Sequence, residues 1–304
     1  MKFDIITFGS ALIDVFVNTD LSEKNNFIYY PVGAKILIKE LRFDIGGGGT
    51  NTATAFARLG FKTGYIGKLG NDNNAKDILN FLKKEKIAFL GKIDKKEKTG
   101  YSVVLDSKGG ERTILTYKGA NNNLSFNEIP KIKASWLYYS ALLEKSLGSQ
   151  IKLVRLLLKK GTKLAFNPSM YLIKEINLKP LLKLTTILIL NKEEAEMLCK
   201  KNNLDEKNPL DSLAKLGPKI IVITNKDKLV SCFAENKRYF LKPHRNIKVV
   251  ERTGAGDAFA SGFVAGQILG WSIKKSLELG LRESEAVLAH FGAKNNLIKM
   301  NLKK

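Results

Sequence analysis

The sequence predicts an α/β fold in which a mainly parallel sheet is covered by helices and a small second sheet is attached. Over most of the 304 residues, short apolar runs of strand length alternate with runs of helical period, and this alternation is typical of a parallel sheet. Two segments, about 15–45 and 97–118, instead alternate apolar and polar residues without a helical period, which predicts antiparallel strands. We expect both segments to build one small sheet within a single domain of residues 1–304, because no linker-like composition divides the chain.

The elements of the main sheet begin at the first residues. An apolar strand at 3–9 is followed, beyond the first irregular segment, by a helix of small residues that ends at Gly60. Further strands are predicted at 62–67, 136–140, 163–167, 186–190 and 219–224, and further helices at 75–86, 150–160, 191–200 and 210–216. Runs 229–233 and 238–241 predict an antiparallel edge, and helices are expected at 258–269, 272–281 and 284–290.

The composition is that of an ordinary globular protein. Hydrophobic residues make up 44% of the chain and charged residues 26%. Apolar runs stay short of the roughly 18 residues that a membrane span needs, and the acidic start at Asp4 is unlike a signal peptide. We therefore expect a cytoplasmic protein with no membrane partner. With two histidines and two cysteines, a histidine-based metal site or a Ser-His-Asp triad is disfavoured.

The formal net charge of +22 raises the question of a nucleic-acid partner. The basic residues are mostly lysines spread along the whole chain, whereas nucleic-acid binders usually cluster arginines among aromatic residues. We expect a solvated lysine-rich surface and no specific nucleic-acid partner. Such a field still attracts anionic substrates.

The stretch from 251 to 262 joins an apolar strand-like run to a helical one. Gly254, Ala255 and Gly256 leave the backbone open at this point, and the free amides and dipole of a helix N-terminus favour an anion. Asp257 follows in the first turn, where its carboxylate would repel a bound anion. An acid at this position is therefore explained best if it has a chemical role of its own. Taking a proton from a nucleophile that attacks a phosphate is such a role. The alternative is a well-capped helix start with no chemistry.

Two further segments bring polar groups towards the same sheet. Asp14 lies just past the predicted strand at 3–9, where open α/β sheets place ligands, although a plain surface turn is the alternative. Gly46 and Gly47 open a run of four glycines that leads through Thr50 and Asn51 into a helix. These glycines let backbone amides and Asn51 approach a polar ligand closely, whereas a flexible joint is the alternative.

These motifs, taken together, resemble the ribokinase-like, or PfkB, family of sugar kinases. The matching pieces are Gly46-Gly47-x-x-x-Asn51, Asn191-x-x-Glu194 and Thr253-Gly254-Ala255-Gly256-Asp257, in the family's order and rough spacing. The resemblance covers essentially the whole chain. It implies a three-layer α/β/α sandwich with a small β lid over the sugar site, and transfer of the γ-phosphoryl group of ATP to a sugar hydroxyl.

The resemblance also assigns roles by position. Asp257 is the general base, and the amides of Gly254, Ala255 and Gly256 form the anion hole. Glu194 lies near Mg²⁺ and acts mostly through water. The implied nucleotide-binding residues are Asn191, Thr224, Thr253, Gly254 and Gly256, and the implied acceptor-binding residues are Asp14, Gly46, Gly47 and Asn51.

Departures from the family pattern leave parts of the function open. Glu251 stands where the family commonly has Asp, so binding of a monovalent cation such as K⁺ beside this segment is an open prediction. Gly48 stands where ribokinase-type members usually have Lys. A nucleoside or a hexose monophosphate therefore remains an alternative acceptor to an unphosphorylated sugar, and a non-catalytic nucleotide- or sugar-binding protein is a further alternative. Arg112 is either a substrate contact or part of a lid ion pair. A homodimer through the lid is predicted from its exposed strands.

Overall fold

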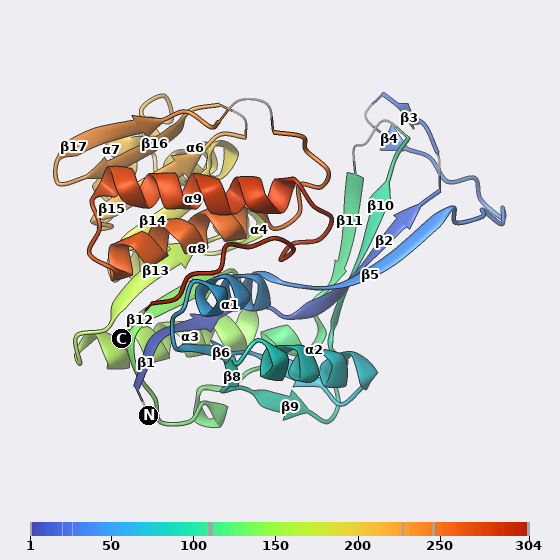
Figure 1. Ribbon diagram of the computed structural model, residues 1–304, viewed down its shortest axis with the longest axis horizontal. Coiled ribbons are helices and arrows are strands. Elements are labelled where there is room, and N and C mark those ends of the chain that lie inside the picture. The colour runs from blue at the N-terminus through green and yellow to red at the C-terminus, as the bar shows by residue number, and fades with distance from the viewer. Residues whose placement is uncertain are drawn as a thin grey trace.

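The computed structural model describes residues 2–19, 21–25, 27–108, 112–226, 228–244 and 247–302. Figure 1 shows a sandwich of helices and strands from which a smaller sheet projects to one side. A membrane-spanning helix is absent from these ranges. Asp20, Asn26 and residues 109–111, which belong to the two segments predicted to form the small sheet, lie outside the described ranges.

The central sheet has the order β17-β16-β15-β14-β13-β12-β1-β6-β8 within the described residues. Its strands are β1 (Lys2–Phe8), β6 (Thr63–Ile66), β8 (Ala88–Phe89), β12 (Lys133–Ser140), β13 (Lys163–Asn167), β14 (Ile187–Asn191), β15 (Ile220–Thr224), β16 (Val230–Ala234) and β17 (Lys237–Leu241). All neighbours pair in parallel except β15 with β16 and β16 with β17. The predicted parallel sheet with an antiparallel edge is confirmed.

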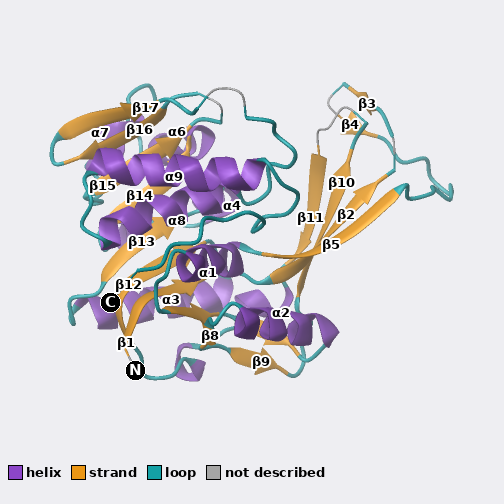
Figure 2. Ribbon diagram, viewed as in Figure 1, coloured by secondary structure: helices purple, strands orange, loops and turns teal. Residues whose placement is uncertain are grey.

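Helices cover both faces of this sheet, which makes the three-layer sandwich (Figure 2). On one face lie α1 (Gly48–Arg58), α8 (Ala255–Ile268) and α9 (Ile273–Leu288), and on the other α3 (Glu144–Leu158), α4 (Met170–Glu175), α5 (Lys179–Leu182), α6 (Lys192–Lys201) and α7 (Pro209–Ala214). Strand alternation divides the core between them. In β12, Trp136 and Tyr138 join the core under α8, whereas Leu137 and Tyr139 join the opposite core.

The two predicted β-rich segments form one four-stranded sheet, which we call the lid sheet. Its order is β11-β10-β2-β5, with β2 (Leu12–Asn18), β5 (Glu40–Gly46), β10 (Gly100–Asp106) and β11 (Arg112–Tyr117). Two short pairs accompany it, β3 (Glu23–Lys24) with β4 (Phe27–Ile28) and β7 (Lys68–Gly70) with β9 (Lys92–Asp94). Helix α2 (Asn73–Lys84) packs against β2 and β7.

Three sequence expectations were wrong in detail. The lid sheet is not wholly antiparallel, because β2 and β10 pair in parallel. Asp14 lies beyond β1 as predicted, but it belongs to strand β2, which excludes the alternative of a surface turn. In the second half of the segment 15–45, which was predicted to form strands, β5 begins only at Glu40, where pairing with Asn18 starts. The two expected helices at 272–281 and 284–290 are one helix, α9, since no Gly or Pro interrupts residues 281–288.

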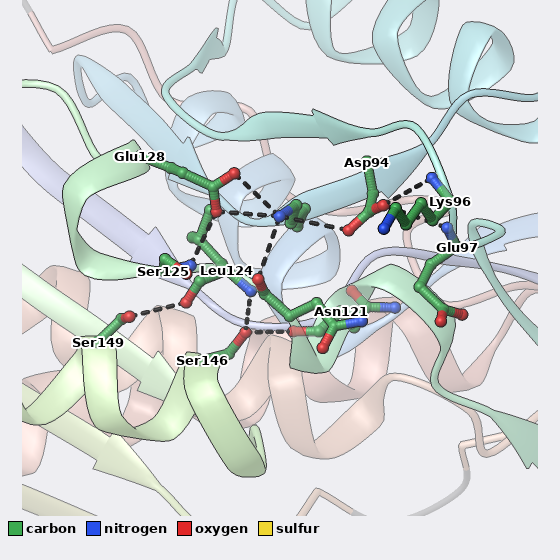
Figure 3. A network of polar contacts seen from close by, with 11 residues as sticks. Asp94, Lys96, Glu97, Asn121, Leu124, Ser125, Glu128, Ser146 and Ser149 are labelled. Atoms are coloured by element: carbon green, nitrogen blue, oxygen red, sulfur yellow. Dashed lines mark hydrogen bonds and ion pairs between the residues drawn. The ribbon is translucent and has the colours of Figure 1, made fainter.

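A buried polar network, part of which is drawn around Asn121 and Ser146 in Figure 3, supports the junction between the central sheet and the lid sheet. Asn121, in the 3₁₀ turn η1 (Gly119–Asn122), accepts a hydrogen bond from the Ala11 amide at 2.8 Å and donates one to the Ala11 carbonyl at 2.9 Å. The hydroxyl of Ser146 donates to the carbonyl of Asn121 at 2.7 Å. Ala11 lies between β1 and β2, so this clamp fixes the point at which the chain enters the lid sheet.

Candidate active site

The site is built around the N-terminus of α8. Gly254 is its N-cap with φ 80°, a conformation that L side chains rarely adopt, and a Cβ at this position would lie 2.5 Å from the Cβ of Ala293. A Cβ at Gly256 would meet nothing within 4 Å. The first turn of α8 therefore faces open space with amides that have no partner inside the helix, which is the geometry of an anion site.

Asp257 lies in this first turn and is held from another helix. The Asn51 amide nitrogen, in α1, donates to Asp257 Oδ2 at 2.8 Å. Burial raises the pKa of Asp257, and this effect is opposed by the Asn51 hydrogen bond and by the charge of Lys294. Because Asn51 holds one carboxylate oxygen, the other is left to accept a proton.

The glycine run approaches a second carboxylate. Gly47 is the N-cap of α1 with φ 99°, and a Cβ there would lie 2.5 Å from the Ser10 carbonyl oxygen. A Cβ at Gly46 would lie 1.8 Å from Asp14 Oδ2, so only a glycine leaves room for this carboxylate. Asp14 is 8% exposed, and burial raises its pKa to about 6.

Asn191 and Glu194 form a capping box at the start of α6. The Asn191 side chain accepts from the Glu194 amide at 2.8 Å, and the Glu194 carboxylate accepts from the Asn191 amide at 3.0 Å. Burial raises the pKa of Glu194 to about 7, and the charge of Asp257 adds to this rise. Thr224 ends β15 as the register neighbour of Asn191. Asn191 and Thr224 therefore lie at the same edge of the sheet, and Glu194 is near enough to the start of α8 to interact with the charge of Asp257.

Strand β11 of the lid sheet is bonded to the segment before α8. The Arg112 guanidinium pairs with Glu251 and donates to the Thr253 hydroxyl at 2.7 Å. Glu251 also accepts from the Thr253 amide at 2.8 Å. The lid ion pair that was predicted as one alternative for Arg112 is therefore present. It connects the lid sheet to the residues that lead into the anion site.

One residue of this site was missed by the sequence analysis. Lys294 follows the Gly292-Ala293 pair, is 3% exposed, and donates to Asn51 Oδ1 at 2.9 Å and to the carbonyl of Ile45. In the sequence it is one of many lysines near the C-terminus, and it carries no periodicity or cap signal. Only its burial marks it.

Hydrogen bonds and charge interactions thus connect several of the predicted residues. Helix α8 and its N-cap supply Asp257, Gly254 and Gly256, and α1 supplies Asn51, which is bonded to Asp257. Lys294 connects this group to Asp14 and the adjacent Gly46 and Gly47, because it is hydrogen-bonded to Asn51 and interacts with the charge of Asp14. Asn191 and Thr224 end β14 and β15 as register neighbours, and Glu194 in α6 interacts with the charge of Asp257.

Comparison with known proteins identifies the family of this chain. The family model described as pfkB family carbohydrate kinase matches residues 2–300. The chain belongs to the PfkB family of carbohydrate kinases. A 5-dehydro-2-deoxygluconokinase of Clostridium perfringens is 30% identical over 95% of this chain and 88% of its own length.

Solved structures of PfkB-type fold superpose over nearly the whole chain. The adenosine kinase of Schistosoma mansoni in complex with 2-fluoroadenosine has a TM-score of 0.83 at 21% identity, covering 95% of this chain and 96% of that one. Ribokinase of Cryptococcus neoformans in complex with ADP has a TM-score of 0.79 at 24% identity, covering 97% and 96%. As a PfkB carbohydrate kinase, the protein is an enzyme whose implied phosphoryl donor is ATP.

Proposed function

We propose that this kinase transfers the γ-phosphoryl group of ATP to a hydroxyl of a small unphosphorylated sugar, with Asp257 as general base. The observation that carries the proposal is the carboxylate of Asp257, fixed by Asn51 at 2.8 Å beside the open N-terminus of α8. A hydroxyl placed against the free oxygen of Asp257 would lose its proton as its bond to phosphorus forms and the bond from phosphorus to the ADP oxygen breaks.

The amides of Gly254, Ala255 and Gly256 would stabilise the charge on the transferred group. The open face of Gly256 and the left-handed cap at Gly254 support this role. Loss of one such donor in comparable sites costs roughly a hundred- to thousand-fold in rate. Thr253, Asn191 and Thr224 would line the nucleotide side. Thr253 precedes the N-cap of α8, and Asn191 and Thr224 are register neighbours at the ends of β14 and β15.

The acceptor would bind on the lid side. Asp14 is a hydrogen-bond acceptor suited to a sugar diol, with Gly46 and Gly47 bringing the backbone close to it. The name of the Clostridium perfringens relative adds a keto sugar acid to the candidate acceptors. Nucleosides and hexose monophosphates remain the alternative acceptors within the family.

The residues present suit a Mg²⁺ ion that is bound mainly through phosphates and water. Among the described residues, no group of three or more His, Cys, Asp or Glu side chains could hold a metal ion, and Mg²⁺ commonly uses one or two carboxylates together with substrate phosphates. Glu194 would hold it through water. When bound, the ion would neutralise phosphate charge. A requirement for K⁺ stays a prediction, to be checked by exchanging K⁺ for Na⁺ in the assay.

We further propose that two copies pair through the outer face of the lid sheet. Leu41, Phe43, Leu115 and Tyr117 are between 49% and 63% exposed. They alternate with Asp14, Ser102 and their register partners, so they lie on the face away from the site. Exposed apolar surface of this kind marks interaction sites. Phe43→Lys should convert a dimer to a monomer in sedimentation velocity, and an unchanged sedimentation coefficient would contradict this surface.

The test of the function is a coupled ADP-release assay with MgATP. The acceptor panel holds ribose, fructose, a keto sugar acid, nucleosides and hexose monophosphates, and Asp257→Asn is the control. One strong acceptor in the wild type, lost by orders of magnitude in the variant while ATP binding is kept, is the expected result. Near-normal turnover by Asp257→Asn would overturn the base assignment, and binding of ATP without any acceptor would favour the binding-protein alternative. A cytoplasmic location and the lack of a specific nucleic-acid partner stay predictions.

A further inference from the structure

The segment at 292–294 contacts three of the elements that carry the proposed site. A Cβ at Gly292, which has φ 88°, would lie 2.5 Å from Asp44 Oδ2, and the Cβ of Ala293 lies against Gly254. Lys294 then enters the interior and is 3% exposed. One short segment is thus packed against the lid sheet, the start of α8 and, through Lys294, helix α1.

Lys294 determines which way the Asn51 amide points. Its ammonium group can only donate hydrogen bonds, so the atom of Asn51 that lies 2.9 Å from Nζ must be the oxygen. The amide nitrogen then necessarily points to Asp257 Oδ2, at 2.8 Å. A flipped amide would place NH₂ against NH₃⁺ and oxygen against carboxylate, so both contacts would be lost.

Lys294 also offsets a concentration of negative charge. Asp14 and Asp44 are directly opposite each other in the lid sheet and share one face. The carboxylates whose charge acts on Lys294 are, in decreasing order, Asp44, Asp14 and Asp257, and together they oppose the lowering of its pKa by burial. Like charges opposite each other in a sheet destabilise it, and a nearby cation relieves this.

Other charged groups face the same place. Arg58 acts on Lys294 from α1, Arg112 acts on Asp14 from β11, and Glu194 interacts with Asp257 from α6. Tyr138 of β12 is likewise affected by Asp257 and Glu194. Among these groups, Lys294 is the cation that donates a hydrogen bond to Asn51, the residue that holds Asp257.

We propose that Lys294 is a positioning residue for phosphoryl transfer: it fixes the Asn51 amide, and through it the Asp257 carboxylate, and it supplies the positive charge that keeps the acidic acceptor side ionised. This inference rests on the proposed role of Asp257 as base. It predicts two separable contributions, one from the hydrogen-bond donor and one from the charge.

Two variants separate these contributions. Lys294→Met removes both donor and charge, whereas Lys294→Gln keeps a neutral donor for Asn51. The matched control is Lys68→Met. Lys68 is also buried, at 8% exposure, but its ion pairs are with Asp94 at 3.3 Å and Glu128 at 2.9 Å, two carboxylates that have no part in the proposed site.

The readout is kcat as a function of pH, together with KM for ATP and for the acceptor and the melting temperature. Removal of a neighbouring cation should shift the acid limb of the kcat–pH profile to higher pH by about one unit in both Lys294 variants. At a given pH on that limb, turnover then falls roughly tenfold. The plateau at high pH should fall in Lys294→Met and recover towards the wild-type value in Lys294→Gln. Lys68→Met should lower the melting temperature and leave the pH profile in place.

An activity-independent measurement keeps this test separate from that of the proposed function. The Asp257 carboxyl can be titrated by carbon-13 NMR in the wild type and in Lys294→Gln, with Asp257→Asn to assign the signal. A higher Asp257 pKa in Lys294→Gln supports the inference even if no acceptor is found. The inference is overturned if the Asp257 pKa and the acid limb of the kcat–pH profile stay where they are in the wild type and only the melting temperature falls. Lys294 would then be a structural residue. If the Lys294 variants behave as expected but Asp257→Asn keeps its turnover, the proposed base is wrong and the inference fails with it.

Discussion

Asp14 offers a sharp test of the acceptor side, because its ionisation falls within an accessible pH range. Its pKa is raised to about 6, chiefly by burial, with the charge of Asp44 adding to the rise and that of Lys294 opposing it. If the acceptor hydroxyls donate to the ionised carboxylate, protonation of Asp14 should weaken acceptor binding. The apparent Kd should then be constant above about pH 7 and rise roughly tenfold by pH 5, as expected for a single group with this pKa.

The perturbation is Asp14→Asn, which keeps the shape of the side chain and removes its charge. A hydrogen bond to a charged group contributes about 1.5–3 kcal/mol, so the variant should bind the acceptor roughly 10- to 150-fold more weakly at neutral pH. Its binding should no longer depend on pH between 5 and 8. Asp44→Asn is the matched variant. It removes a neighbouring negative charge and so lowers the pKa of Asp14, and the loss of acceptor binding should therefore begin at a lower pH than in the wild type.

The assay is calorimetric titration of the acceptor in the presence of a non-hydrolysable ATP analogue, which excludes the pH dependence of the chemical step. A wild-type Kd that is flat from pH 8 to pH 5 would refute the assignment of Asp14 to the acceptor. The same conclusion would follow if Asp14→Asn retained the wild-type pH dependence.

Three further predictions concern the lid, the core and the anion site. Arg112→Met removes the contacts from β11 to Glu251 and Thr253. We expect acceptor-independent ATP hydrolysis to rise severalfold, because water can then enter the site. Equal ADP release by variant and wild type without acceptor would contradict this role. Glu283 is fully buried, and burial raises the pKa of its carboxyl to about 8, so its destabilising effect grows as pH rises from its ordinary range towards that value. Glu283→Gln should therefore stabilise the fold near pH 8 by an amount on the order of 3 kcal/mol and hardly at all near pH 4.5. Urea unfolding at both pH values measures this difference, and an equal gain in stability at both would disprove the linkage. Gly256→Ala should raise stability by roughly 0.5–1 kcal/mol because a helical glycine is replaced, yet lower kcat/KM for ATP because the methyl group enters open space beside Asp257; a parallel rise in melting temperature and activity would contradict the anion site.

Short-range features of this protein could be predicted from the sequence because local physics fixes them. Alternating strand and helix patterns gave the parallel sheet, and the β-rich segments gave the lid sheet. The glycine at 254 occupies a left-handed cap, as a strand-to-helix turn requires. The three-residue spacing of Asn191 and Glu194 is the spacing of a capping box, so this motif is explained by helix geometry before any ligand is considered.

Contacts between distant segments were decided by the tertiary structure. Asn51 and Asp257 are 206 residues apart, and Lys294 is 243 residues from Asn51. Residue types alone do not tell which of many lysines is buried, and the burial of Lys294 depends on how the last segment packs against α1 and α8. The position of Asp14 in a strand likewise follows from pairing with β5 and β10. The sequence by itself therefore determined the fold class and the individual motifs, whereas the hydrogen bonds and charges that connect these motifs exist only once the chain is folded.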